Sequence, residues 1–429
     1  MFVIASFVIC YFCKIIKKPT TIDTKEYNAY YQSSNITPNY VAQSQPFIRP
    51  ESQSTFNRYS AVPLNGGGGS SVYSAIGEGV VGRHPSPAPS SSAPLLAAEP
   101  RAVDVPGALT ALRLESERIK LVQSLLEGTY GEVYTGICLL SSESSAAAPD
   151  GKQLHSTTVE IPVVVKTVKA TASELHRIKF LEEGLSFFGI SDHPNVCQVM
   201  AASVSLSDRN VSLSSNNSEL RSGAQHPPER PLLCYPHAGY GNLKLFLQRS
   251  REKGSSFHLQ TQDVVFMALQ IIKGMLHLHR FRILHRDLAA RNCLVGEDLT
   301  VQICDPALSR DVFPQDYECL CDNEIRPVKW MSIEALSRQT FTSASDVWSF
   351  GVTMWELLTC GIQPYAEVEA EELLGCLVAG NRLPQPSCCP DELFGVIYCC
   401  WSHHSVARPN FEQLLIALED FYNQLVEYI

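Results

Sequence analysis

A short polar stretch between two apolar runs carries the residues whose types and spacing best suit chemistry. In Ile283-Leu284-His285-Arg286-Asp287-Leu288-Ala289-Ala290-Arg291-Asn292-Cys293-Leu294-Val295, Asp287 precedes Asn292 by five residues. A carboxylate can accept the proton of an attacking hydroxyl, and an amide oxygen can hold a metal ion that neutralises charge on a transferring phosphate. We expect the flanking Ile283-Leu284 and Cys293-Leu294-Val295 to be short buried strands. A motif this long and ordered indicates a phosphoryl-transfer loop rather than a surface turn.

This stretch also carries a family resemblance. His285-Arg286-Asp287 followed by Asn292 resembles the protein-kinase catalytic loop, and Ala289-Ala290-Arg291 is similar to its tyrosine-kinase variant. The segments from Asp305 to Pro314 and from Asp322 to Met331 resemble most closely the Ryk/Derailed family of atypical receptor tyrosine kinases, which are Wnt receptors. The likeness runs from about Ser116 to the C-terminus. It implies an α+β, two-lobed protein-kinase fold, with a small β-rich N-lobe and a larger, mostly helical C-lobe.

The resemblance implies ATP and Mg²⁺ as cofactors and assigns the charged residues. Asp287 would be the catalytic base, with Arg291 beside it in the same loop. Asn292 and Asp305 would hold the magnesium ions.

Two further charged residues precede this loop. Lys166 ends the β-branched run that begins at Val163, and it would hold the α- and β-phosphates. Glu183, in a helix that Ser173 opens, would pair with Lys166, and Glu182 is the neighbouring alternative.

The expected ATP site combines a glycine turn with a strand and hinge. Leu126-Glu127-Gly128-Thr129-Tyr130-Gly131-Glu132-Val133-Tyr134 resembles the loop that covers the phosphates, because glycines let backbone amides approach a nucleotide. Taken alone, this sequence would be a plain β-hairpin. By resemblance, the nucleotide-binding residues are Gly128, Gly131, Val133, Lys166, Tyr235, His237 and Ala238. Pro236 removes one backbone donor within this hinge.

The sequence Asp305-Pro306-Ala307 stands where typical kinases carry Asp-Phe-Gly. Proline restricts the residue before it to extended conformations, whereas family kinases hold this aspartate left-handed when active. We therefore expect the active arrangement to be strained by about 1–3 kcal/mol. Two functions follow as alternatives: a weak protein-tyrosine kinase, or a catalytically impaired pseudokinase that acts as a membrane-attached signalling scaffold.

Several other residues have expected roles. Tyr317, the only tyrosine between Asp305 and Glu334, is the candidate activation-loop phosphosite, and Arg286 is its expected partner once it is phosphorylated. By resemblance, a buried Asp346 would accept hydrogen bonds from the catalytic-loop backbone. Glu334 and Arg408 would form a structural ion pair.

The N-terminal part is expected to differ from the kinase-like domain at 116–429. Residues 1–18 pair an apolar run with following lysines, which fits the cytoplasmic end of a transmembrane segment, although a cleaved signal peptide remains an alternative. Residues 19–115 are rich in Ser, Pro and Gly and predict a disordered juxtamembrane linker. We thus expect a single-pass plasma-membrane protein with a cytoplasmic kinase-like domain. A Wnt ligand would need an ectodomain that this sequence lacks.

Charge and cysteine content narrow the choice of partners. The net charge of −10 argues against nucleic acid as a partner and leaves protein substrates or signalling proteins. Fifteen scattered cysteines without paired metal spacing favour reduced, cytosolic thiols. The terminal Glu427-Tyr428-Ile429 could bind a PDZ-type groove, and a frayed helix end is the alternative.

Overall fold

The structure is a computed structural model that describes residues 103–142, 157–204, 230–252, 258–320 and 324–427. All of these residues belong to one compact unit. The predicted transmembrane segment 1–18, most of the predicted linker and the terminal Tyr428-Ile429 lie outside the described residues. Within the described ranges, no helix has the length and apolar character needed to cross a bilayer.

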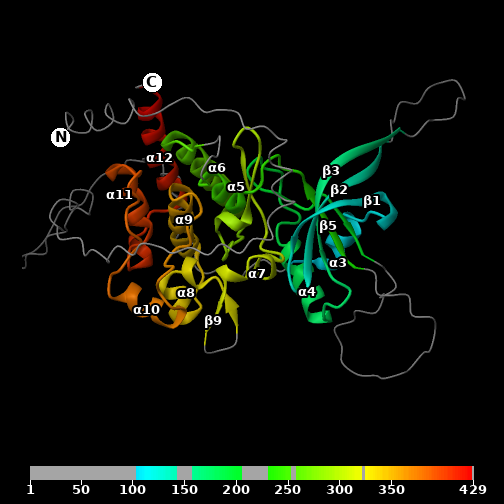
Figure 1. The fold of residues 1–429 in the computed structure, drawn as a ribbon, viewed down its shortest axis with the longest axis horizontal. Coiled ribbons are helices and arrows are strands. Elements are labelled where there is room, and N and C mark those ends of the chain that lie inside the picture. Colours follow the sequence, from blue (N-terminus) through cyan, green and yellow to red (C-terminus); the bar gives the residue numbers. More distant parts are fainter. Residues whose placement is uncertain (1–102, 143–156, 205–229, 253–257, 321–323, 428–429) are drawn as a thin grey trace, which may run out of the picture. The chain divides into compact units, whose positions relative to one another are not determined.

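A five-stranded antiparallel sheet forms the N-terminal lobe, in the order β1-β2-β3-β5-β4 (Figure 1). Val163 and Val165 belong to one buried cluster and Val164 to another, so β3 is covered on both faces. Because strand side chains alternate, Lys166 shares the face of Val164, which borders the cleft. The strands are β1 (Ile119–Glu127), β2 (Gly131–Ser142), β3 (Thr157–Val168), β4 (Ala201–Ser203) and β5 (Leu232–Pro236). The predicted glycine turn and β3 are therefore confirmed as local structure.

Two helices pack on this sheet. Helix α4 (Glu174–Gly184) begins after Ser173, whose hydroxyl accepts a hydrogen bond from the backbone N–H of His176 at 3.3 Å. Helix α3 (Val105–Ala111) has Asp104 as its N-cap and places Ala108 in the same buried cluster as Phe180 of α4. The prediction of a disordered linker up to residue 115 is wrong at this end, because an apolar face of α3 has a core to pack against.

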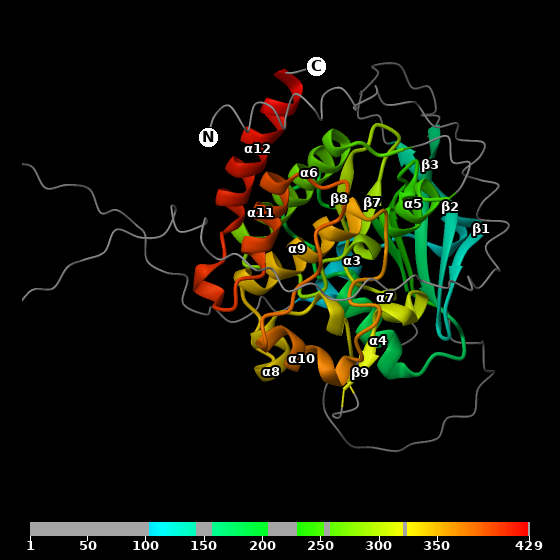
Figure 2. The ribbon, with the colours of Figure 1, turned by 60° about the vertical axis from the view of Figure 1, so that its left-hand side comes forward.

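The C-terminal lobe is mostly helical (Figure 2) and has two small sheets, one ordered β6-β7-β8 and one formed by β9 and β10. Helices α6 and α9 are buried along most of their length, and α12 packs against α6. The helices are α5 (Leu243–Ser250), α6 (Thr261–Arg280), α7 (Ser309–Val312), α8 (Ile333–Arg338), α9 (Ser343–Leu358), α10 (Ala370–Val378), α11 (Asp391–Cys400) and α12 (Phe411–Glu427). The short strands are β6 (Gly241–Asn242), β7 (Cys293–Val295), β8 (Val301–Ile303), β9 (Glu318–Cys319) and β10 (Ile325–Arg326).

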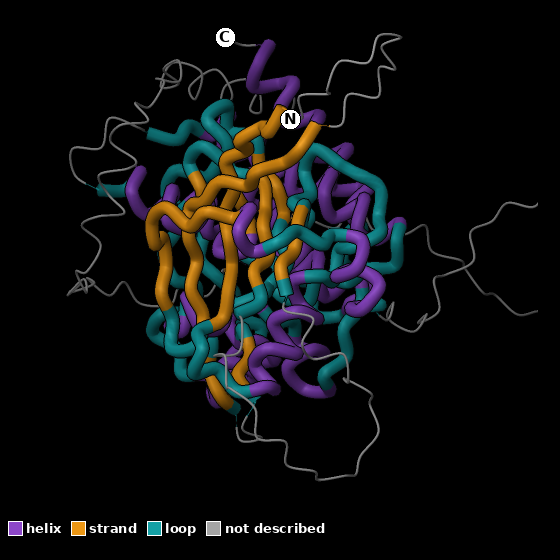
Figure 3. The backbone as a smooth tube through the Cα atoms, turned by 90° about the vertical axis from the view of Figure 1, so that its right-hand side faces the viewer, coloured by secondary structure: helices purple, strands orange, loops and turns teal. Residues whose placement is uncertain are grey.

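The tube view separates the two kinds of structure, with strands gathered apart from most helices (Figure 3). This arrangement agrees with the predicted α+β, two-lobed fold. The predicted strand at Cys293-Leu294-Val295 is β7, but the one at Ile283-Leu284 is wrong. The backbone N–H of Ile283 donates to the carbonyl of Leu278 at 3.0 Å. This segment therefore forms hydrogen bonds with the C-terminal end of α6 rather than with a neighbouring strand.

Candidate active site

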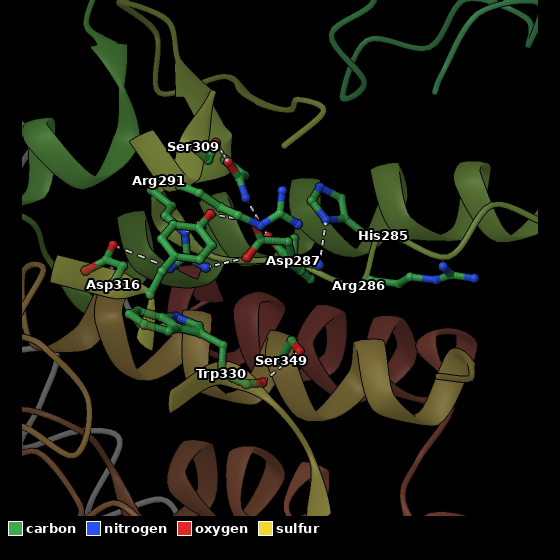
Figure 4. A network of polar contacts seen from close by, with 12 residues as sticks. His285, Arg286, Asp287, Arg291, Ser309, Asp316, Trp330 and Ser349 are labelled. Carbon is green, nitrogen blue, oxygen red and sulfur yellow. Dashed lines mark hydrogen bonds and ion pairs between the residues drawn. The ribbon is translucent and has the colours of Figure 1, made fainter. Parts of the chain in front are cut away.

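The catalytic loop is fixed to the C-terminal lobe by one buried carboxylate. Asp346 of α9 accepts hydrogen bonds from the backbone N–H groups of His285 and Arg286, each at 3.0 Å, and contacts the ring of His279 at 2.9 Å. The predicted role of Asp346 is thus what the structure shows. Arg286 has a left-handed φ of 63°, and its side chain points away from the catalytic cluster, over the ring of Phe341 (Figure 4).

Both carboxylate oxygens of Asp287, the expected base, accept hydrogen bonds. One donor is in the same loop and the other is a tyrosine thirty residues further along the chain. The hydroxyl of Tyr317 donates to Asp287 Oδ2 at 2.5 Å, and Arg291 Nη2 donates to Oδ1. Arg291 Nε also donates to the Tyr317 oxygen at 2.8 Å. Burial raises the pKa of Tyr317 well above its ordinary value, and Asp287 adds to this rise. The protonated phenol therefore occupies Oδ2 of the carboxylate that the sequence predicts to be the base.

A buried charge network continues from Arg291 (Figure 4). Arg291 Nη1 lies 3.4 Å from Asp316 Oδ2, and Lys244 of α5 donates to both oxygens of Asp316. All three side chains are almost fully buried. Sequence reasoning missed Lys244 and Asp316; the available signal was a lysine inside the apolar run of α5. This network holds the segment before Tyr317 in the cleft.

Lys166 and Asp305 meet across the two lobes. Lys166 Nζ lies 3.1 Å from Asp305 Oδ1 and 4.7 Å from the centroid of the Tyr235 ring. Burial alone would lower the pKa of Lys166, but the Asp305 carboxylate more than offsets it and the pKa is raised. Asp305 Oδ1 also accepts from the N–H of Ala307 at 3.1 Å. Asp305 has no positive φ, in agreement with the restriction expected from Pro306.

The predicted ion pair between Lys166 and Glu183 is not formed. Glu183 accepts from Arg310 Nη1 of α7, while Lys166 is held by Asp305. Burial raises the pKa of Glu183, although Arg310 partly offsets this effect. Glu182, the alternative, is exposed, whereas Glu183 is half-buried and holds the ion pair with Arg310. The pairing fails because α7 supplies a guanidinium on the cleft side of α4.

The glycine turn and Asn292 are also engaged by α7. Asp311 accepts hydrogen bonds from the N–H groups of Thr129, Tyr130 and Gly131 at 2.8, 3.0 and 2.6 Å. The hydroxyl of Ser309 donates to Asn292 Oδ1, the oxygen expected to bind metal. The four-residue helix α7 thus contacts Asn292, Glu183 and the glycine turn together.

Two cavities border these groups and differ greatly in size. The one lined by Val133, Lys166, Tyr235, Asn292 and Asp305 has a volume of about 70 Å³. Small-molecule sites usually enclose about 300–1,000 Å³, so this small cavity is closed to a ligand of that size. A second, open cleft of about 910 Å³ is lined by residues of α4, the catalytic loop and α7.

The donor set fits ATP and Mg²⁺ in chemistry, although the closed cleft does not have the room. An amide oxygen (Asn292) and a carboxylate (Asp305) are hard oxygen ligands of the kind Mg²⁺ prefers. The nucleotide-binding residues expected from the sequence divide into two groups. Val133, Lys166 and Tyr235 line the small cavity, whereas Gly128, Gly131, His237 and Ala238 do not.

A two-lobed unit with these residues at its cleft has the architecture of a protein kinase. The family model described as protein tyrosine and serine/threonine kinase matches residues 119–418.

Relatives narrow the class. The inactive tyrosine-protein kinase RYK of Caenorhabditis elegans is 37% identical over 100% of this chain and 68% of its own length. The tyrosine-protein kinases RYK of Homo sapiens and Dnt of Drosophila melanogaster are each 38% identical, over 76% and 75% of this chain. This chain spans 48% of each of those two relatives. The chain belongs to the RYK, Derailed and Dnt group of the protein kinase family.

Proposed function

We propose that the chain is the kinase-bearing part of a receptor-tyrosine-kinase-like protein that transfers the γ-phosphate of ATP to protein tyrosine with weak activity. The observation that carries this proposal is that every catalytic group is present at the cleft but already paired within the chain. Lys166 is held by Asp305, Glu183 by Arg310, and Asp287 by Tyr317. Activity requires these contacts to open, which makes turnover slow.

The residues have distinct tasks in this reaction. Asp287 accepts the proton of the substrate tyrosine hydroxyl, and Arg291 orients that carboxylate through its Nη2. Lys166 positions the phosphates once Glu183 replaces Asp305 as its partner. Bound Mg²⁺, held by Asn292 and Asp305, supplies charge neutralisation for the transferring phosphoryl group.

Control by Tyr317 belongs to the same proposal. Tyr317 is 6% exposed while its hydroxyl contacts Asp287, so it must leave the cleft before another kinase molecule can modify it. A phosphate on Tyr317 would carry a charge of about −1.5 to −2 and could not return beside the Asp287 carboxylate. The exposed Arg286 would then be its partner.

A pseudokinase scaffold is the second candidate. It is favoured by the nucleotide cleft of about 70 Å³ and by Asp305-Pro306-Ala307. The C. elegans relative is also named inactive. In either case we place the chain at the plasma membrane with its kinase domain in the cytoplasm, in Wnt signalling and axon guidance through an ectodomain outside this sequence. A PDZ-type partner would bind the C-terminus.

Phosphotransfer by the purified full chain separates the two candidates. The substrate is a generic tyrosine peptide with ATP and Mg²⁺, and Asp287→Asn is the blank because it lacks the base. Slow turnover above that blank supports the kinase. Turnover equal to the blank, over hours and at high enzyme concentration, rejects it and leaves the scaffold.

A further inference from the structure

The backbone of the glycine turn forms a small anion-binding nest. The N–H groups of Thr129, Tyr130 and Gly131 converge on one carboxylate, that of Asp311. Lys169 stabilises the start of the turn. Its Nζ donates to the carbonyl of Gly128 at 2.8 Å and to the side chain of Glu127 at 2.7 Å. Successive N–H groups that point into one concavity are a recognised site for phosphate oxygens and carboxylates.

Glycine at position 128 is what lets the carboxylate in. A Cβ built on Gly128 would lie 2.1 Å from Asp311 Oδ2, well inside contact distance. Asp311 itself is 8% exposed, although Pro314 and Gln315, three and four residues further along the chain, are exposed. The carboxylate therefore occupies a cradle that any other residue at position 128 would fill.

Asp311 is adjacent in sequence to the residue that holds α4. Arg310 binds Glu183, and Asp311 binds the glycine turn, so α7 joins α4 and the turn through side chains of opposite charge. Tyr130 of the turn also stacks on His176 of α4, with ring centroids 4.1 Å apart. Release of Asp311 would loosen the turn, α7 and α4 together.

We propose that Asp311 is an internal competitor for the phosphate-binding amides, so that an oligophosphate can enter only by displacing its carboxylate. The proposal rests on the proposed role of this turn in nucleotide binding. The nest borders the open cleft of about 910 Å³, which Thr129, Tyr130 and Asp311 line, so an anionic group can reach it from that side. A carboxylate and a phosphate oxygen cannot occupy the same three donors at once.

The first test is hydrogen exchange of the full chain, read by mass spectrometry on the peptide that contains Thr129 to Gly131. We compare wild type with Asp311→Asn, which keeps the size of the side chain and removes its charge. Glu318→Gln is the matched control, because Glu318 binds Lys329 at 3.0 Å, away from the turn. We expect exchange of the turn amides to accelerate about tenfold in Asp311→Asn and to stay unchanged in the control, because charged acceptors hold N–H groups more strongly. Equal protection in all three proteins would overturn the proposal.

The second test adds tripolyphosphate or ATP to the same proteins. If Asp311 competes, the oligophosphate should restore the exchange protection of the turn amides in Asp311→Asn. The concentration needed should be about tenfold or more below the concentration that changes amide exchange in the wild-type turn. If oligophosphate protects neither protein, or both at the same concentration, Asp311 is not a competitor. Neither test measures phosphotransfer. A failed turnover assay would therefore reject the proposed activity and leave this inference standing.

Discussion

Two sets of charged side chains in this chain behave differently, one in the helical C-terminal lobe and one at the cleft. Arg408 and Glu334 form a bidentate pair at 2.6 and 2.8 Å, as predicted by resemblance. At the cleft, Lys166 and Glu183 were also predicted to pair and instead have separate partners. Arg408 and Glu334 therefore pair with each other, whereas at the cleft Lys166 pairs with Asp305 and Glu183 pairs with Arg310.

The reason lies in the number of opposite charges within reach. Lys166 pairs with Asp305, which lies in the loop after β8, whereas Glu183 of α4 pairs with a different cation. The cation that pairs with Glu183 is Arg310 of α7. We infer that the C-terminal pairs contribute stability and that the cleft pairs regulate access to the catalytic groups.

The largest effect should come from breaking the C-terminal pair. Arg408→Ala leaves Glu334 partly buried without its charge partner, so we expect the free energy of unfolding to fall by about 3–5 kcal/mol in denaturant titration. Lys273→Ala is the control, because its partner Glu419 lies 3.3 Å away and both side chains are about half exposed. That change should cost about 0–1 kcal/mol. Similar losses in the two variants would contradict the contrast.

Replacing Arg310 should change stability less than replacing Arg408 does, but it should change which carboxylate pairs with Lys166. Arg310→Gln should destabilise by about 1–2 kcal/mol, since both partners are partly exposed, and it frees Glu183 for Lys166. A zero-length carbodiimide cross-link should join Lys166 to Asp305 in wild type and shift toward Glu183 in the variant. Arg310→Lys, which keeps the charge, should retain the wild-type cross-link.

Tyr317→Phe tests the contact with the base. Loss of the hydroxyl removes bonds to Asp287 and Arg291 and should lower the free energy of unfolding by about 1 kcal/mol. The segment around residue 317 should become more accessible to limited proteolysis. Tyr365→Phe is a matched control in the C-terminal lobe. If proteolysis at the segment is unchanged, the tyrosine hydroxyl does not hold it in the cleft.

The smallest effect is the pH dependence of the C-terminal pair. Burial raises the pKa of Glu334, but Arg408 outweighs burial and the pKa lies below the ordinary value of 4.5. A depressed carboxylate pKa gives stability that is present above about pH 4.5 and is lost as pH falls through the folded-state pKa. The difference in unfolding free energy between wild type and Glu334→Gln should therefore narrow below pH 4.5. A difference independent of pH would contradict this assignment.

The sequence predicted most of what depends on local patterns. The β-branched run from Val163 to Lys166 favours a strand, and β3 confirms it. Helix α3 escaped prediction because its burial depends on contacts with Phe180, far along the chain.

At the site, sequence reasoning identified the residues but not their partners. Asp287, Lys166, Glu183, Asn292 and Asp305 all lie at the cleft. Their pairing depends on α7, whose four residues have no helical periodicity to detect. Ser309, Arg310 and Asp311 read as ordinary polar loop residues until the fold brings them to the catalytic groups.

The central claim is that the catalytic groups are intact and restrained by the segment that begins at Asp305. The most direct measurement is turnover on a generic tyrosine peptide by the purified full chain and by Pro306→Phe with Ala307→Gly, with Asp287→Asn as the blank. Pro306 lies where typical kinases carry a phenylalanine that packs near His285. In this structure the ring of Phe187 is beside His285, with ring centroids 5.9 Å apart. We predict weak wild-type turnover that the double variant raises, because the Asp305 backbone is freed and the apolar contact restored. Robust wild-type activity that the double variant does not improve would contradict the account.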